Sequence, residues 1–165
     1  MKKLSVLFSL VAILTIASFT AKAQVSATAT SSATIITPIA ISKSIDLNFG
    51  NVAVSPSLAG TVQLSPASTR TAGGGVTLPV VTGTVSAAKF TVTGAAGSTF
   101  SISLPAAPIT LTSGSNTMTV GTFTSNPTPT GTLTAGTQDV FVGATLNVAA
   151  GQAAGVYTNA TGLVV

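Results

Sequence analysis

Residues 45–49 read Ile-Asp-Leu-Asn-Phe, and residues 140–148 read Val-Phe-Val-Gly-Ala-Thr-Leu-Asn-Val. In the first stretch, Ile45, Leu47 and Phe49 alternate with two polar residues. Side chains of a β-strand point alternately to its two faces, so this period of two predicts a strand with one buried face. The second stretch is rich in valine, and we expect another strand there.

Similar patterns recur along the chain after residue 23. Further strands are predicted at residues 25–35, 61–64, 76–78, 89–93, 99–104, 117–124 and 155–165. Turn-forming pairs such as Gly50-Asn51 separate them, and the absence of glutamate together with frequent Gly and Pro argues against helices. This arrangement of short strands predicts an all-β fold, namely a single Ig-like, fimbrial-type antiparallel β-sandwich preceded by a signal helix. A barrel is the alternative.

Two residue types are expected to have structural roles. Six of the nine predicted strands each contain one aromatic side chain, at a position that points inward, and we expect these side chains to fill the core. They are Phe49, Phe90, Phe100, Phe123, Phe141 and Tyr157. The run Gly73-Gly74-Gly75 lacks the Lys-Ser/Thr that completes a phosphate-binding loop, so we expect a flexible connection there.

The beginning of the chain predicts export. Lys2 and Lys3 form a basic region, residues 4–19 are apolar, and Ala21-Lys22-Ala23 has the small-x-small pattern of a signal peptidase site. We therefore expect cleavage between Ala23 and Gln24, with Ala21 as the other small residue of the site. The mature chain is then extracellular or at the cell surface, with the periplasm as the alternative. No later stretch is long and apolar enough to span a membrane.

The predicted organisation has three parts: a signal peptide at 1–23, an extended segment or first strand at 24–34, and the β-sandwich at 35–165. Small apolar residues fill odd positions of residues 25–35, which we call the donor segment. The candidate strand-donor residues are Val25, Ala27, Ala29, Ala33 and Ile35. A strand with this alternation can enter the sheet of a neighbouring copy, as in fimbrial assembly, or form the first strand of its own sandwich. The pattern leaves both arrangements open.

Charge excludes one class of partner. The whole chain carries a net charge of +4, but three of its six cations lie in residues 1–23. The ionisable side chains that follow are Lys43, Arg70, Lys89, Asp46 and Asp139. Three scattered cations cannot neutralise a row of phosphates, so no nucleic-acid partner is expected. With little charge to repel neighbours, self-association or contact with other surface subunits is expected.

Composition also argues against catalysis. The chain has no His, Cys or Glu, which removes the usual general base, the thiolate nucleophile and most metal ligands. A carboxylate pair would need Asp46 and Asp139, and a Ser–Lys dyad would need residues 42–44 or the pair Ser86 and Lys89. No motif supports either arrangement. We expect no enzyme activity, no cofactor and no metal site.

Five segments, in order along the chain, resemble one known family. They are Ala33-Thr-Ile-Ile-Thr-Pro-Ile-Ala-Ile-Ser42, Asp46-Leu-Asn-Phe-Gly-Asn51, Thr117-Met-Thr-Val-Gly-Thr-Phe-Thr124, Val142-Gly-Ala-Thr-Leu-Asn-Val148 and Gln152-Ala-Ala-Gly-Val-Tyr157. From about Thr30 to the end, the chain resembles the domain of unknown function (DUF) 4402 family. The resemblance implies a small secreted bacterial β-sandwich, akin to spore-coat-U and fimbrial-type domains, with no catalytic residues to transfer. It also implies that the final strand is truncated here.

These observations predict an exported, non-catalytic structural or adhesive cell-surface protein, such as a fimbrial-like subunit. The alternative is a monomeric secreted binding module for surface glycans or proteins. Its site would lie on the loops around Asn51, residues 73–75 or Asn126. The sequence does not identify a ligand.

Overall fold

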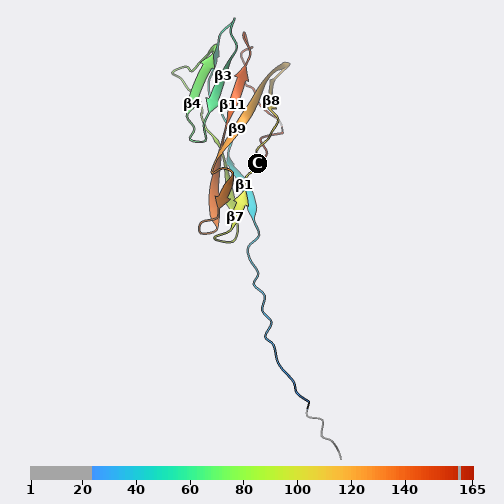
Figure 1. Cartoon of the computed structure of the whole chain (residues 1–165). Helices are drawn as coiled ribbons and strands as arrows, with labels where there is room; N and C mark the ends of the chain where they lie inside the picture. The colour runs from blue at the N-terminus through green and yellow to red at the C-terminus, as the bar shows by residue number, and fades with distance from the viewer. Residues whose placement is uncertain (1–23, 160) are drawn as a thin grey trace, which may run out of the picture. The chain divides into compact units, whose positions relative to one another are not determined.

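The computed structural model describes residues 24–159 and 161–165 (Figure 1). Residues 24–34 and residues 35–165 belong to separate units, and every strand lies in the second unit. The predicted signal helix and the cleavage-site residues Ala21 and Ala23 fall outside the described residues. In the part that is described, the chain contains no helix, and hence none that could cross a membrane.

The described residues form eleven strands. They are β1 (Ala40–Ile45), β2 (Ala53–Val54), β3 (Gly60–Leu64), β4 (Arg70–Gly74), β5 (Val76–Thr77), β6 (Ala88–Thr93), β7 (Thr99–Ser101), β8 (Ile109–Ser113), β9 (Asn116–Asn126), β10 (Thr130–Thr132) and β11 (Thr137–Val148). All their pairings are antiparallel. The predicted all-β class is confirmed.

The longest strand, β11, organises the large sheet. Its residues 137–142 pair with β6, residues 144–148 pair with β3, and residues 141–147 pair with β9. The sheet order is therefore β1-β6-β11-β3-β4, and β9 and β8 join at the other edge of β11. Two small sheets, β10-β7 and β2-β5, complete the fold.

The small sheets cover the buried face of the large one, which gives the sandwich. Val76 of β5 belongs to a core cluster with Val62 and Leu146 of the large sheet. Phe100 of β7 packs against a second cluster that contains Val140 of β11. Along β11 every second residue from Val140 to Val148 is buried, so the period of two in the sequence is the burial pattern of the strand.

The predicted strand at residues 155–165 is not formed. Among the described residues of this stretch, only Thr158 pairs, through an isolated bridge to Thr112. The Asn159 carboxamide oxygen accepts hydrogen bonds from the backbone N–H groups of Thr161 and Gly162, at 2.7 and 2.6 Å. Such local hydrogen bonds from the backbone to a side chain compete with strand pairing.

Two other expectations need correction. The glycine run is not a free loop, because Gly73 and Gly74 belong to β4 and pair with Thr61 and Gly60. A Cβ atom on Gly60 would lie 2.3 Å from the Gly73 carbonyl oxygen, so the absence of side chains allows this close pairing. Of residues 45–49, β1 includes only Ile45; beyond it, Asn48 forms a single bridge to Ser86.

The aromatic residues are only partly as expected. Phe49 and Phe90 are buried, and Phe100 and Phe123 pack against the core. Phe141 alternates with the buried Val140 and Val142 and therefore lies on the opposite face of β11. The Lys89 ammonium is 5.7 Å from the centre of its ring. Tyr157 is partly buried, and its hydroxyl donates to the Ala153 carbonyl at 2.7 Å.

Gly143 lies where β11 passes from β6 to β3, and it provides a test of this architecture. A Cβ atom there would lie 2.2 Å from the Leu64 carbonyl oxygen, which is backbone of the paired strand. We expect Gly143→Ala to lower the free energy of unfolding by about 1–3 kcal/mol, measured by urea denaturation.

Gly121 of β9 is the matched control. It pairs with Thr145 of β11, but a Cβ atom there meets only the Pro108 side chain, at an ordinary 3.5 Å. We expect Gly121→Ala to leave stability within about 1 kcal/mol of the original value. Equal effects of the two substitutions would contradict the account of the β11 crossover.

Candidate functional site: an apolar groove beside an unpaired strand edge

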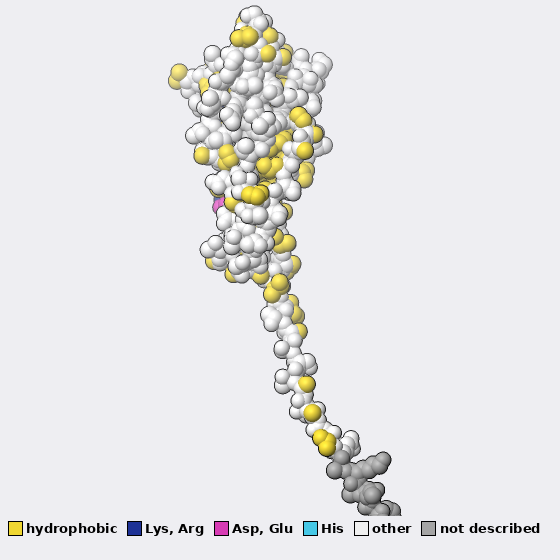
Figure 2. All heavy atoms as spheres, in the orientation of Figure 1, with side chains coloured by type: hydrophobic (Ala, Val, Ile, Leu, Met, Phe, Trp, Pro, Cys, Tyr) yellow, Lys and Arg dark blue, Asp and Glu magenta, His cyan; other side chains and the backbone are white. Residues whose placement is uncertain are grey.

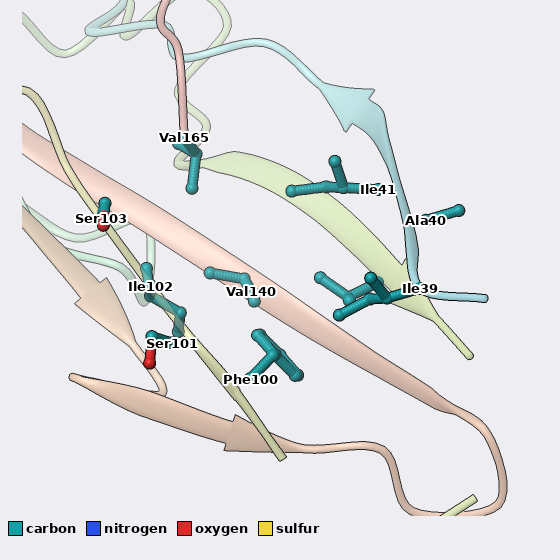
Figure 3. A pocket seen from close by; sticks show the side chains of 10 residues that line it. Ile39, Ala40, Ile41, Phe100, Ser101, Ile102, Ser103, Val140 and Val165 are labelled. Atoms are coloured by element: carbon teal, nitrogen blue, oxygen red, sulfur yellow. The ribbon is translucent and has the colours of Figure 1, made fainter. Parts of the chain in front are cut away.

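An apolar groove of about 230 Å³ opens over the half of the sandwich that contains β1 (Figure 3). Ile39 and Ile41 form one wall, and Phe100 and Ile102 form the opposite wall. Val140 of β11 lies between the two walls. The groove is lined almost entirely by aliphatic and aromatic carbon, so it suits an apolar side chain rather than a charged ligand.

The strand beside this groove has an unpaired edge. Within the described residues, β1 pairs with β6 and with no other strand, and all six of its residues are exposed. Ile41 and Ile45 are 51% and 43% exposed. The one charged residue of β1, Lys43, forms an ion pair with Asp46, with Nζ and Oδ1 2.5 Å apart. Edge strands usually avoid association through charges, bulges or a covering element, and the charge on β1 is already neutralised.

The donor segment is exposed along its whole length. Residues 24–39 form no strand, and Val25 and Ile35 are 94% and 98% exposed. The side chains of Ala27, Ala29 and Ala33 are exposed as well. The first strand expected at 25–35 as part of its own sandwich is absent from this structure, and pairing with another copy stays a prediction.

An ion pair lies on the outer face of β6 and β11. Lys89 Nζ is 2.9 Å from Asp139 Oδ2, and the Thr91 hydroxyl donates to Asp139 Oδ1 at 2.8 Å. Two hydrogen bonds lower the pKa of Asp139 below its ordinary value. The bond from Lys89 has the largest effect, and the bond from the Thr91 hydroxyl has the next largest. This cluster was not expected from the sequence, because positions 89 and 139 become neighbours only through the β6–β11 pairing.

The candidate catalytic groups are all engaged in structural contacts. Asp46 and Asp139 each pair with a different lysine, so each lysine of the suggested Ser–Lys dyads is held by a carboxylate. The Ser86 hydroxyl donates to the Asp46 backbone oxygen at 2.7 Å, and the Ser44 hydroxyl lies 3.2 Å from that of Thr91. Among the described residues, no three His, Cys, Asp or Glu side chains gather where they could hold a metal ion.

The loops suggested for a glycan site do not form one site. The Arg70 guanidinium donates to the Phe49 and Asn51 carbonyls, which ties down the Asn51 turn. Asn126 pairs with Phe141, at the middle of β11, whereas Gly74 pairs with Gly60 beside its far end. At about 3.4 Å per residue, these places are more than about 20 Å apart along the strand.

A different polar feature emerges on the outer face. The pairing registers align Thr61, Asn147, Thr119 and Thr110 across β3, β11, β9 and β8. We call these four residues the polar row. Asn147 Nδ2 donates to the Thr119 hydroxyl at 3.3 Å, and Thr61, Thr119 and Asn147 line a shallow depression. Sequence gives no signal for the row, because its members are brought together by register alone.

Comparison with protein families agrees with this all-β structure. The family described as Domain of unknown function (DUF4402) matches residues 39–165. The chain belongs to the DUF4402 family. The match starts later than the resemblance expected from about Thr30, so the DUF4402 domain includes the groove and the polar row, and the donor segment precedes it. No curated protein and no solved structure matches the chain.

The Lys89–Asp139 pair of the DUF4402 domain predicts a pH effect. Because the folded-state pKa of Asp139 is lowered, the pair stabilises the fold above about pH 4, and this stability is lost as pH falls through the folded-state pKa. We expect Lys89→Met to raise the pKa of Asp139 toward its ordinary value of about 3.9, measured by NMR titration of the carboxyl carbons.

Lys43→Met is the control, since Lys43 pairs with Asp46 instead. It should leave the titration of Asp139 unchanged. If Asp139 titrates identically in both variants and in the original protein, the ion pair does not set its pKa.

Proposed function

We propose that this DUF4402 protein is an exported, non-catalytic structural or adhesive protein of the bacterial cell surface. In this proposal it is a fimbrial-like subunit that self-associates when the donor segment of one copy enters the sheet of another. The observation that carries the proposal is the exposure of an alternating, uncharged segment that forms no strand.

The chemistry of the segment supports pairing with a sheet. Five of its six odd positions hold the apolar residues Val25, Ala27, Ala29, Ala33 and Ile35, the sixth holds Ser31, and its even positions hold only serine or threonine. Such a strand can bury one face, expose the other and add a backbone hydrogen-bond ladder. It contains no charge that would have to leave water.

The state of the ionisable groups supports a non-catalytic role. In the described part of the chain, Lys43 and Lys89 are paired with aspartates, and Arg70 donates to two backbone carbonyls. Each lysine ammonium therefore faces a carboxylate rather than a serine hydroxyl, so the geometry of a Ser–Lys dyad is not formed at either lysine. The surface seen in Figure 2 is correspondingly almost free of charged side chains.

The proposal predicts that a charge weakens assembly at an odd-numbered position of the donor segment but not at an even-numbered one. Ala29→Lys places a charge on the apolar side of the donor segment, and we expect it to weaken self-association of the mature chain at least about tenfold. Thr30→Lys adds the same charge on the other side and should have little effect. Sedimentation velocity measures both. Equal behaviour of the two variants would contradict strand donation.

Deletion of residues 24–34 separates the two arrangements that the sequence left open. Loss of assembly with unchanged thermal unfolding supports donation to another copy. Unfolding of the shortened chain would instead show that the segment belongs to its own sandwich.

The polar row favours a second candidate, a monomeric module that binds uncharged surface glycans. Its hydroxyl and carboxamide groups lie on neighbouring strands about 4.8 Å apart and can hydrogen-bond successive sugar hydroxyls. We expect a glycan array probed with the mature chain to give signals that Asn147→Ala abolishes and Lys43→Met retains. An array without signals would remove this candidate.

A further inference from the structure

We propose that the free edge of β1 is the acceptor for the donor segment. In this arrangement the segment of a second copy lies beside β1, and its odd-numbered side chains enter the apolar groove between Ile41 and Phe100. This inference rests on the proposed function and adds the site on the partner copy.

The backbone of β1 is suited to accept a strand. One side of β1 pairs with β6 over residues 40–45, and no described strand pairs with its other side. The N–H and C=O groups that point away from β6 therefore have no partner in a ladder. An incoming strand would supply those partners, which is the backbone part of strand addition.

Around Ile41 the side chains of β1 have a two-sided pattern like that of the donor segment, although Lys43 lies opposite Phe90 on the same side as Ile41. Ile41 lies opposite Val92 on the groove side. Ser42 pairs with Thr91 across the ladder, and the Ser44 hydroxyl lies 3.2 Å from the Thr91 hydroxyl. A strand with apolar odd positions and hydroxyls at even positions extends both faces at once: carbon beside Ile41, and hydroxyls beside Ser42 and Ser44.

The size of the groove fits small side chains. Its opening lies between Ile41 on one layer and Phe100 on the other, and its volume is about 230 Å³. Three of the six odd-position side chains of residues 25–35 are alanine and one is Ser31, and such small side chains can enter a narrow space without forcing the layers apart. Covering the groove would also remove Ile39 and Ile41, now 60% and 51% exposed, from water.

The occupant is the segment of a second copy rather than the chain's own. To fold back onto β1, a chain would have to turn within residues 36–39. Ile39 is itself part of the groove wall, and no residue from 36 to 39 is in a turn. A turn there would withdraw Ile39 and so remove part of the surface that the segment is meant to cover. A second copy meets no such conflict.

A complementation experiment with the mature chain tests the acceptor. Ile41→Lys places a charge in the groove and leaves the donor segment unchanged. Ala29→Lys places a charge on the apolar side of the donor segment and leaves the groove unchanged. We expect each variant alone to associate at least about tenfold more weakly. An equimolar mixture should form one-to-one dimers, because one good donor then meets one good acceptor.

Ser42→Lys is the matched control, since it adds the same charge to the other face of β1, and it should assemble like the original chain. Thermal unfolding of each variant verifies the fold; Ile39→Lys replaces Ile41→Lys if the latter unfolds.

Any of four results would overturn the acceptor site. If Ile41→Lys assembles normally while Ala29→Lys does not, donation stands but the acceptor is elsewhere. If both assemble normally, the proposed function fails as well. If the mixture of the two folded variants stays monomeric, β1 is not the acceptor. If the original mature chain is itself monomeric, the groove does not bind a second copy.

Discussion

The backbone ladder of β11 is the interaction on which the rest of the molecule depends. Val142 pairs with Ala88 of β6 and also with Ser125 of β9. Leu146 pairs with Val62 of β3 and with Val120 of β9. A residue in a strand has only two lateral neighbours, so β6 and β3 must share one edge of β11 in succession. This sharing divides the core into one cluster beside β3 and another beside β6.

The large sheet extends unequally on the two sides of this divided core. On the β3 side, the sheet continues to β4, and β8 and β9 extend it in the other direction. On the β6 side, it ends after one more strand, β1, whose residues are all exposed. The apolar groove lies on this shorter side, where Phe100 of β7 and the residues Leu163 and Val165 pack against the cluster of Val92 and Val140; Val165 also lines the groove.

The scarcity of charge determines what kinds of contact remain. The described ion pairs join Lys43 to Asp46 and Lys89 to Asp139. The Arg70 guanidinium donates hydrogen bonds to two backbone carbonyl oxygens. A partner therefore meets hydroxyls, carboxamides, unpaired backbone groups and apolar grooves. Recognition by shape and hydrogen bonding follows from this composition, and both proposed functions use those contacts.

The sequence by itself determined the all-β class and most of the core, because the alternation in residues 89–93 and 140–148 is the physical cause of strand burial. It also showed the alternation in residues 25–35 from which the candidate strand-donor residues were proposed. It failed at residues 155–165, where the Asn159 carboxamide oxygen accepts hydrogen bonds from the Thr161 and Gly162 N–H groups and competes with strand pairing. Only the tertiary structure decided which residues share a surface. The groove, the Lys89–Asp139 pair and the polar row join positions that are far apart in the chain, and strand register, which no local pattern encodes, brings them together.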